Sequence, residues 1–462
     1  MFRLFKHYVP HAVIGLWLVE LATLLLAAEA GWRLYAHQIG MGVGALGDRW
    51  LPLITFSVTL QLGMMATGFY GNEALRSMKF GVARLIAGVS LGVIFLALVR
   101  FVFPEWTLWR ANSIYAMAVA LAALFAIRFL LMLFVGTDSF RRRIVVLGAG
   151  RRAARIGELA GQPGGGFTVA GYVAMTDDPA AVAGAVRRGD IDSLADHVTA
   201  LGAGEVVLAL EERRNALPLA DLLRIKTTGV HVNDMASFLE RETGRVDLAT
   251  TNPSVLIFSD GFSAGQRVAR VSKRLFDIFA SLAVLLSTLP LMLMAAIAIK
   301  LDSRGPVLYR QPRVGLYGEP YDIWKLRSMR EDAESAGQAL WAEENDPRIT
   351  RVGRILRKLR IDELPQCWCV LKGAMSFVGP RPERPSFVAD LEQQMPYYAE
   401  RHMVKPGLTG WAQINYPYGA SVEDARVKLE YDLYYAKNYS PFLDLLILLQ
   451  TVRVVLWPAG AR

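Results

Sequence analysis

Residues 360–384 combine an adjacent pair of acids with an arginine that stands between two prolines. The pair is Asp362 and Glu363, and the arginine is Arg381 in the sequence Gly-Pro-Arg-Pro. Carboxylate and phosphate oxygens are the ligands that Mg²⁺ prefers, and a guanidinium binds phosphate through two parallel hydrogen bonds. Because proline fixes a backbone dihedral, Arg381 is held on a restricted backbone. These residue types therefore predict a site for a phosphate and a divalent metal.

A short amphipathic helix is expected immediately before the acid pair. Residues 351–361 carry apolar side chains at helical spacing and basic side chains on the other face. Neighbouring helical residues point about 100° apart, so Asp362 and Glu363 cannot flank one bond as the two acids of a glycosidase do. One acid can attack or bind a substrate while the other coordinates a metal or orients a group. On these residues alone, a solvated helix end with two surface charges is an open alternative.

The composition indicates a membrane anchor in front of this segment. The chain has 462 residues, of which 53% are hydrophobic and 20% are charged, an apolar excess over an ordinary soluble protein. A membrane-spanning helix takes about 20 apolar residues, and four stretches approach or reach that length. These stretches are residues 11–28, 51–70, 81–103 and 113–136. Arg128 lies inside the fourth stretch and is expected either to face the bundle interior or to serve a function there.

The distribution of basic residues predicts the orientation of these helices. The N-terminus, the loop 71–80 and residues 141–143 carry an excess of arginine and lysine, whereas the other loops are near balance. By the positive-inside rule, both ends of the bundle are then cytoplasmic. The net charge of +9 follows from basic residues beside the apolar stretches, which suit an anionic lipid surface. We therefore expect membrane lipids as partners and no nucleic acid.

A fold of the dinucleotide-binding type is predicted for the segment after the bundle. Residues 144–160 predict a buried strand, a Gly-Ala-Gly turn and a helix. Two further strands are expected at residues 167–174 and 205–210. Asp177 and Asp178 stand near the place where a ribose-binding acid would lie. A Gly-rich turn also packs a helix onto a strand without any ligand, so a bound dinucleotide is only one alternative.

A helix that enters the membrane and returns to the same face is predicted at residues 273–300. Its apolar core is long enough to span a bilayer, but both flanks are strongly basic, which argues against a crossing. Pro290 lies past the middle, where proline removes a backbone donor and kinks a helix. Ser287 and Thr288 are expected to bond to carbonyls that the break frees. A last apolar segment, residues 441–458, lies along the interface or packs as a core helix.

Seven segments resemble the bacterial sugar transferase domain of polyprenyl-phosphate glycosyl-1-phosphate transferases. They occur in the family's order, and the resemblance covers about residues 265–462. The segments are Lys273-Arg274-x-x-Asp277, the helix with Pro290, GPVLYRQPRVG (305–315), KLRSM (325–329), DELPQ (362–366), VLKG–MS–VGPRP (370–382) and KPGLTGWAQ (405–413). Four membrane helices and a Rossmann-like module in front resemble the large members of that family. Those members include galactose- and glucose-phosphate transferases that start exopolysaccharide or O-antigen synthesis.

The resemblance implies a reaction and a role for each site residue. Asp362 would attack the β-phosphate of a UDP-sugar, release UMP and carry a covalent phosphosugar. Polyprenyl (undecaprenyl) phosphate would then take the phosphosugar, giving polyprenyl diphosphate-sugar. Glu363, together with Asp362, would bind Mg²⁺, or Glu363 would assist proton transfer. The residues carried over as substrate-binding are Lys325, Arg357, Arg381 and Asp432.

The resemblance also implies an architecture and a location. We expect a four-span membrane bundle at 1–138, a Rossmann-like cytoplasmic domain with a linker at 139–262, and a mixed α/β monotopic catalytic domain at 263–462. The protein would be a multi-pass protein of the bacterial inner membrane, with its catalytic domain on the cytoplasmic face. A homodimer is compatible with the resemblance. Galactose and glucose are the leading candidates for the sugar, and no residue decides between them.

Two positions depart from the family pattern. Cys369 stands where the family has asparagine, and Ala374 stands where it has aspartate. If that aspartate orients Arg381 in the family, this chain must hold Arg381 in another way. Cys369 and its neighbour Cys367 lie among apolar residues, so we expect buried free thiols.

Two other functions are open on the sequence. A membrane-tethered, NAD-dependent nucleotide-sugar dehydratase or epimerase would need a second dinucleotide-binding domain and a Tyr-x-x-x-Lys pair. Tyr321 and Lys325 have that spacing, but no second Gly-rich fingerprint follows residue 165. The non-enzymatic alternative is a scaffold with an inactive transferase domain, which the intact acid pair opposes.

Overall fold

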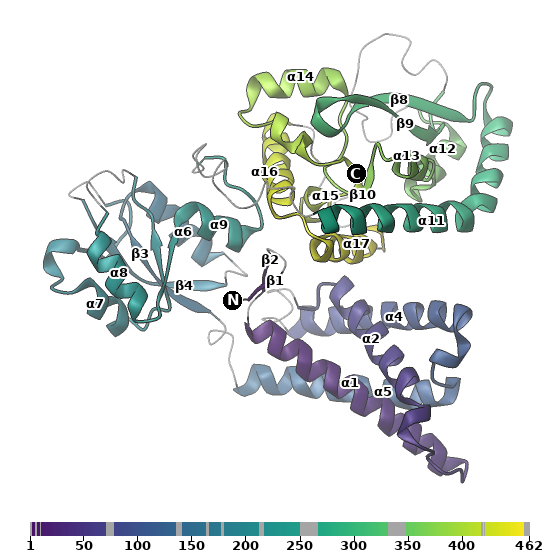
Figure 1. Cartoon of the computed structure of the whole chain (residues 1–462), viewed down its shortest axis with the longest axis horizontal. Coiled ribbons are helices and arrows are strands. Elements are labelled where there is room, and N and C mark those ends of the chain that lie inside the picture. The colour runs from purple at the N-terminus through teal and green to yellow at the C-terminus, as the bar shows by residue number, and fades with distance from the viewer. Residues whose placement is uncertain are drawn as a thin grey trace. The chain divides into compact units, whose positions relative to one another are not determined.

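The protein, known here from a computed structural model, forms two compact units (Figure 1). One unit comprises Met1–Leu4 and Tyr8–Gly244, and the other comprises Phe5–His7 and Arg245–Arg462. The structure describes residues 2–4, 7–9, 11–70, 78–134, 141–162, 166–176, 180–211, 217–249, 267–330, 348–416, 419 and 421–456. The boundary predicted at 262/263 lies outside the described residues.

In the chain, two short strands are followed by a bundle of apolar helices, which belongs to the first unit. The elements are β1 (Phe2–Leu4), β2 (His7–Val9), α1 (His11–Gln38), η1 (Leu46–Asp48), α2 (Trp50–Ala66), α4 (Met78–Val102), η2 (Pro104–Trp106) and α5 (Arg110–Phe134). Leucine, phenylalanine and alanine side chains from all four α-helices form one buried cluster. Four described helices are long and apolar enough to cross a membrane, and three of them lie in this bundle.

The second predicted span is shorter than the sequence suggests. Residues 51–70 predict a span, but α2 has only 17 residues. The fourth helix that is long and apolar enough to cross a membrane is instead Arg270–Asp302, in the second unit. The helix ends because the chain turns: Gly68 adopts a φ of +72°, a left-handed conformation that glycine favours. Its length still lies within the range of about 17–25 residues seen for membrane helices.

Arg128 faces the interior of the bundle, which is one of the two arrangements expected for it. Its side chain is 7% exposed, and its Nε lies 3.2 Å from a carboxylate oxygen of Glu20, which is fully buried. The hydroxyl of Tyr70 donates to the other oxygen of Glu20 at 2.6 Å. A buried charge needs such partners in an apolar surrounding, so these residues join α1 to α5 inside the bundle.

A five-stranded parallel sheet follows the bundle in the chain. Its strands lie in the order β5-β4-β3-β6-β7, and helices separate most of the strands along the chain (Figure 1). The elements are β3 (Arg142–Leu147), α6 (Arg151–Gly161), β4 (Phe167–Ala174), β5 (Ala185–Arg187), η3 (Arg188–Asp190), α7 (Leu194–Ala200), β6 (Glu205–Leu208), α8 (Leu219–Thr227), β7 (His231–Asp234) and α9 (Met235–Thr243). Apolar clusters cover this sheet.

The predicted strand, Gly turn and helix are confirmed as β3, residues 148–150 and α6. Gly148 has a φ of +130°, and a Cβ there would lie 2.5 Å from the carbonyl oxygen of Ala209, so only glycine fits. The two further predicted strands are also present, as β4 and β6. Asp177 and Asp178 lie outside the described residues.

The second unit carries short strands among helices. Strands β8 and β9 pair antiparallel, and β10 pairs parallel with β11. The elements are α11 (Arg267–Asp302), β8 (Leu308–Val314), η4 (Leu316–Gly318), β9 (Pro320–Leu326), α12 (Arg351–Lys358), η5 (Ile361–Glu363), α13 (Gln366–Lys372), β10 (Ser376–Val378), α14 (Pro385–Gln394), η6 (Ala399–Met403), β11 (Gly407–Thr409), α15 (Trp411–Asn415), α16 (Val422–Asn438) and α17 (Pro441–Leu456).

Helix α11 is bent, and both of its ends pack on the same unit (Figure 1). Near its start, Arg274 donates to the carbonyl of Val370 in α13 at 2.6 Å. Near its end, Ile299 packs in a cluster with Leu326 and Leu356. A straight helix of this length would extend about 54 Å, so the bend is what lets both ends contact one domain.

Pro290 lies inside α11, in its second half. Proline has no N–H for the carbonyl four residues earlier, and its ring pushes that turn apart. The hydroxyls of Ser287 and Thr288 both donate to the carbonyl of Val284, at 3.1 and 2.7 Å. The prediction that they bond to a carbonyl freed by the break is therefore wrong: both hydroxyls bond to Val284, whereas the carbonyl that loses its donor to Pro290 is that of Leu286, four residues before the proline.

Helix α17 packs in the core, which is one of the two alternatives expected for residues 441–458. Leu443 and Ile447 are fully buried in the main cluster of this unit. Asp444 accepts a hydrogen bond from Nζ of Lys273 in α11 at 2.6 Å. The helix therefore helps to hold the start of α11.

Candidate active site

The acid pair lies on the short turn η5 between α12 and α13. Helix α12 begins at a cap in which Oγ1 of Thr350 accepts from the N–H of Gly353 at 2.9 Å. The helix ends where Arg360 adopts a φ of +57°, an uncommon left-handed conformation for a residue other than glycine. This change of direction turns Asp362 and Glu363 away from the axis of α12.

Strand β9 brings Lys325 to the acid pair. Its Nζ donates to Oε1 of Glu363 at 3.2 Å. The strand is paired with β8 along its full length, from Leu308 opposite Leu326 to Val314 opposite Pro320. The lysine therefore comes from a rigid hairpin.

Arg381 lies on a turn that packs backbone against backbone. The N–H of Gly379 donates to the carbonyl of Thr409, and the N–H of Gly407 donates to the carbonyl of Pro380, both at 2.9 Å. A Cβ at Gly379 would lie 2.1 Å from the carbonyl oxygen of Lys405, so a larger residue does not fit. The two glycine-containing motifs, VGPRP and KPGLTG, thus build one platform for the arginine.

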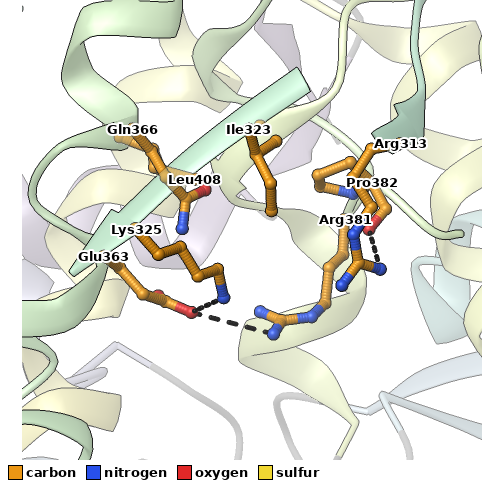
Figure 2. Close-up of a pocket in the computed structure, with 9 residues that line it drawn as sticks. Arg313, Ile323, Lys325, Glu363, Gln366, Arg381, Pro382 and Leu408 are labelled. Carbon is orange, nitrogen blue, oxygen red and sulfur yellow. Dashed lines mark hydrogen bonds and ion pairs between the residues drawn. The ribbon is translucent and has the colours of Figure 1, made fainter. Parts of the chain in front are cut away.

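These elements enclose a small polar pocket (Figure 2). The empty space within it, counted together with the part open to solvent, is about 270 Å³. Lys325 and Arg381 both point toward the carboxylate of Glu363 in Figure 2. The lining residues are Arg313, Ile323, Lys325, Glu363, Gln366, Arg381, Pro382, Gly407 and Leu408.

Glu363 lies among three cations. Its carboxylate oxygens are 3.2 Å from Nζ of Lys325, 3.7 Å from Nη1 of Arg360 and 3.8 Å from Nη2 of Arg381. Burial alone would raise the pKa of Glu363, but the positive charges of these residues outweigh it and lower the pKa to about 2. Glu363 is therefore ionised at every physiological pH.

Asp362 has the opposite electrostatic character. It is 7% exposed, and burial, followed by the negative charge of Glu363, raises its pKa to about 6. The charges of Lys325, Arg357 and Arg360 oppose this rise. Its Oδ1 is buried and has no hydrogen-bond partner among the described residues. Asp362 is not among the residues that line the pocket, so this oxygen is an unsatisfied acceptor just behind the pocket wall.

The structure brings together most of the residues singled out from the sequence. Lys325, Glu363 and Arg381 line one pocket, whereas Asp362 and Arg357 are not among its lining residues. Asp362 is the chain neighbour of Glu363, and the positive charge of Arg357 acts to lower the pKa of Asp362. Asp432 is not among the residues that line the pocket. It is 2% exposed, and its Oδ2 accepts from Nη2 of Arg401 at 2.7 Å.

Three residues beside the acid pair were not predicted from the sequence as site residues. Arg313 and Gln366 line the pocket, and Arg360 pairs with Glu363. Arg313 lies in the motif GPVLYRQPRVG and Gln366 ends DELPQ, so their motifs were available as a signal. Arg360 adopts a left-handed backbone conformation, and its side chain pairs with Glu363, three residues later. No pattern in the sequence indicates that conformation.

The acid pair is the best candidate for a metal site in this unit. Within the described part of the chain, no group of three or more His, Cys, Asp or Glu side chains could hold a metal ion. Mg²⁺ commonly binds one or two carboxylates and completes its shell with water and substrate phosphates. The unpartnered Oδ1 of Asp362 and the ionised Glu363 fit such a site, although the three cations compete with a metal for Glu363.

The two departures from the family pattern lie behind the site. Cys369 and Cys367 are free and each is 2% exposed, as predicted. The Sγ of Cys369 lies 3.5 Å from the carbonyl of Asp322. Cys369 lies within α13 and Ala374 follows its C-cap, and the N–H of Ala374 donates to the carbonyl of Cys369 at 3.1 Å.

Comparison with known proteins matches residues 268–458 to the family described as bacterial sugar transferase. An Aeromonas hydrophila protein named UDP-N-acetylgalactosamine-undecaprenyl-phosphate N-acetylgalactosaminephosphotransferase is 42% identical over 241 residues, 52% of this chain and 56% of that protein. Undecaprenyl-phosphate glucose phosphotransferase of Komagataeibacter xylinus is 45% identical over 188 residues, 40% of this chain and 35% of that protein. Exopolysaccharide production protein PSS of Rhizobium leguminosarum bv. phaseoli is 44% identical over 187 residues, 39% of this chain and 94% of that protein.

The family model matches residues within the unit that carries the acid pair. The chain spans 94% of the Rhizobium protein, but only 56% and 35% of the other two relatives. The matched segment, residues 268–458, includes every residue of the pocket. The names of the relatives give two different sugars, N-acetylgalactosamine and glucose.

Proposed function

The chain belongs to the bacterial sugar transferase family, and we propose that it transfers a sugar-1-phosphate from a UDP-sugar to polyprenyl (undecaprenyl) phosphate. The observation that carries this proposal is the pair Asp362 and Glu363, two adjacent acids with opposite pKa shifts beside a cationic pocket. The names of the relatives supply the class of both substrates. The product would be polyprenyl diphosphate-sugar, with UMP as the leaving group.

In the first step, a carboxylate oxygen of Asp362 attacks the phosphorus that bears the sugar. The bond between this phosphorus and the oxygen bridging to UMP breaks, and UMP leaves. Covalent catalysis divides one transfer between two bulky substrates into two smaller steps. With a pKa of about 6, Asp362 is mostly ionised near pH 7 yet more basic than an ordinary aspartate, which favours attack.

In the second step, a phosphate oxygen of the polyprenyl phosphate attacks the same phosphorus. The bond to Asp362 breaks and restores the carboxylate. Both steps pass through a crowded anionic centre, which Lys325, Arg381 and Arg313 can stabilise from the walls of the pocket. Because the pocket is small, it suits the diphosphate, while the sugar, uridine and lipid extend beyond it.

Glu363 keeps this cation cluster in place before substrate arrives. It neutralises part of the charge of Lys325 and Arg381, which would otherwise repel one another. Its own negative charge also raises the pKa of Asp362. The two acids therefore have separate roles, with Asp362 as the nucleophile and Glu363 as the residue that orients cations.

We propose Mg²⁺ as the cofactor, held by Asp362 and Glu363 together with substrate phosphate oxygens. When bound, it would neutralise charge on the transferring phosphate. The unpartnered Oδ1 of Asp362 supports this assignment. Lys325 and Arg381 would orient the diphosphate from the protein side, whether or not a metal is present.

We propose that α11 is a re-entrant helix, which enters and exits the inner membrane on its cytoplasmic face. The catalytic unit then lies entirely on that face. The contacts of α11 at both ends with one unit support this, since a crossing helix would separate Arg274 from Ile299 by the bilayer. The strongly basic flanks of α11 support a cytoplasmic face. The site would then lie near the headgroups, where a lipid phosphate meets a soluble nucleotide.

For the parallel sheet we propose a Rossmann-like module between the bundle and the catalytic unit. The strand order β5-β4-β3-β6-β7 corresponds to the first five strands of the doubly wound order. At the start of α6, where a pyrophosphate would bind, the carboxylate of Glu211 already accepts from the N–H of Arg151 at 2.8 Å. This supports a structural role for the turn rather than dinucleotide binding.

The dehydratase or epimerase alternative finds no support at Tyr321 and Lys325. Both lie on strand β9, where residues four apart are separated by about 13 Å. They are therefore too far apart to act together on one proton. Lys325 is instead engaged with Glu363.

The proposed function is tested by incubating the purified full chain with Mg²⁺, undecaprenyl phosphate and a panel of UDP-sugars, and by measuring UMP. We expect UMP release with at least one sugar and loss of release in Asp362→Asn. Release of UDP instead of UMP, or release that persists in Asp362→Asn, would contradict the proposal. The same panel identifies the sugar.

A further inference from the structure

Arg401 is a buried cation that joins the Arg381 turn to helix α16. Arg401 is 4% exposed and Asp432 is 2% exposed. Nη2 and Nε of Arg401 donate to Oδ2 of Asp432 at 2.7 and 3.1 Å. The same Nη2 donates to the main-chain carbonyl of Arg381 at 3.0 Å. Asp432 is therefore linked to the pocket through Arg401.

The orientation of this guanidinium is fixed from a third side. Nη1 of Arg401 donates to the hydroxyl of Tyr398 at 3.0 Å, and its Cζ lies 5.2 Å from the centre of the Tyr398 ring. Hydrogen bonds from a charged donor are stronger than neutral ones. In a buried pair, removal of one partner leaves the other charge uncompensated.

The next carbonyl of the turn is held in the same manner. Nη1 of Arg313 donates to the carbonyl of Pro382 at 3.1 Å. Two arginines from distant parts of the chain thus bind consecutive carbonyls, those of Arg381 and Pro382. The side chain of Arg381 leaves this turn toward Glu363, 3.8 Å away.

We propose that Asp432 and Arg401 form a positioning pair that fixes the backbone of Arg381, and that Asp432 does not itself contact substrate. Its effect on the reaction passes through Arg401 to the Arg381 carbonyl and so to the guanidinium in the pocket. The inference rests on the proposed function for its kinetic consequence. It replaces the substrate-binding role carried over to Asp432 from the family resemblance.

The test is a double-mutant cycle in the full chain, with UMP release as the readout. Asp432→Asn is measured in the wild-type background and in the Arg381→Ala background, and Arg401→Lys serves as a second variant of the pair. Misplacing a phosphate-binding group by a fraction of an ångström to 1 Å costs about 10- to 100-fold in rate. We expect a loss of that size in the wild-type background and a loss below about 3-fold in the Arg381→Ala background.

Glu430→Gln is the matched control. Glu430 lies on the same helix, is 4% exposed and pairs with Arg245 at 3.3 Å, on a side that does not include the Arg381 turn. We expect this variant to keep its rate within about 3-fold. An equal loss for Asp432→Asn in both backgrounds would overturn the proposal, because Asp432 would then act independently of Arg381.

Hydrogen exchange separates this inference from the proposed function. Asp432→Asn and Arg401→Lys should speed amide exchange in the segment 376–384, whereas Glu430→Gln should leave it unchanged. If no UDP-sugar releases UMP, the proposed function fails, and the exchange result still decides whether the pair holds the turn. Unchanged exchange in both pair variants would overturn the positioning role.

Discussion

The Nζ of Lys325 lies 3.2 Å from Oε1 of Glu363, and this ion pair joins strand β9 to the turn that carries the acid pair. Burial lowers the pKa of Lys325, while the negative charge of Glu363 opposes that shift. The lysine and its neighbours keep Glu363 ionised, and Glu363 in turn raises the pKa of Asp362. Burial and the charge of Glu363 make Asp362 a basic carboxylate, while Lys325 and the neighbouring arginines keep Glu363 an anion.

Loss of Lys325 should weaken catalysis more than binding of the lipid. In Lys325→Met, Glu363 loses its nearest cation, and the transferring phosphate loses one of its positive partners. Removing a group that stabilises transition-state charge costs on the order of 100-fold in kcat. Lys372→Met is the control, because Lys372 lies against the rings of Trp324 and Trp368 and does not line the pocket. Equal rates for the two variants would contradict the assignment.

The rate of UMP release should depend on pH through Asp362. Its pKa is raised to about 6, so the nucleophilic carboxylate is protonated, and the rate falls, as the pH drops through this value. An unshifted aspartate would lose activity only near pH 4. The check is the pH profile of kcat/KM between about pH 4.5 and 8. A profile flat down to about pH 5 would contradict the raised pKa.

Asp362→Asn should stabilise the fold at neutral pH while it abolishes activity. An acid whose pKa is raised by folding binds more protons in the folded state, so stability falls as the pH rises from about 4 to about 6. The asparagine variant lacks this fall. We expect its Tm to exceed that of the wild type more at about pH 7.5 than at about pH 4.5. A lower Tm at neutral pH would indicate that Asp362 is structural.

The topology of α11 can be checked by labelling single cysteines from either side of the membrane. A cysteine at Glu319, in the turn between β8 and β9, should react only from the cytoplasmic side if α11 is re-entrant. A cysteine at Gly42, in the loop between α1 and α2, should react only from the opposite side. The native Cys367 and Cys369 are 2% exposed, which keeps the background low. Labelling of both positions from one side would refute this topology.

Much of the site follows from the sequence because its residues lie in contiguous motifs. The amphipathic pattern before Asp362 predicts α12, which the structure contains. The basic flanks around Pro290 predict a helix that returns to the same face of the membrane, and this stays a prediction. The residues that a local sequence pattern misses make contacts with segments far away in the sequence. Arg401 donates to the carbonyl of Arg381 and Arg313 donates to the carbonyl of Pro382, and such contacts depend on how distant segments pack.

Local sequence patterns also fail to predict where a single residue in a left-handed conformation redirects the chain. Arg360 adopts a left-handed conformation that no side-chain pattern indicates, and it brings a third cation to Glu363. The early end of α2 has the same origin, since Gly68 turns the chain within an apolar stretch. Hydropathy alone cannot register either turn.

The central claim is that Asp362 forms a covalent bond to the phosphosugar, and mass spectrometry tests it most directly. The full chain is mixed with a UDP-sugar and Mg²⁺ in the absence of polyprenyl phosphate, quenched and digested. We predict a phosphosugar adduct on the peptide that contains Asp362, absent from Asp362→Asn and lost when undecaprenyl phosphate is added. An adduct on another residue, or UMP release only in the presence of the lipid with no adduct at any time, would contradict it.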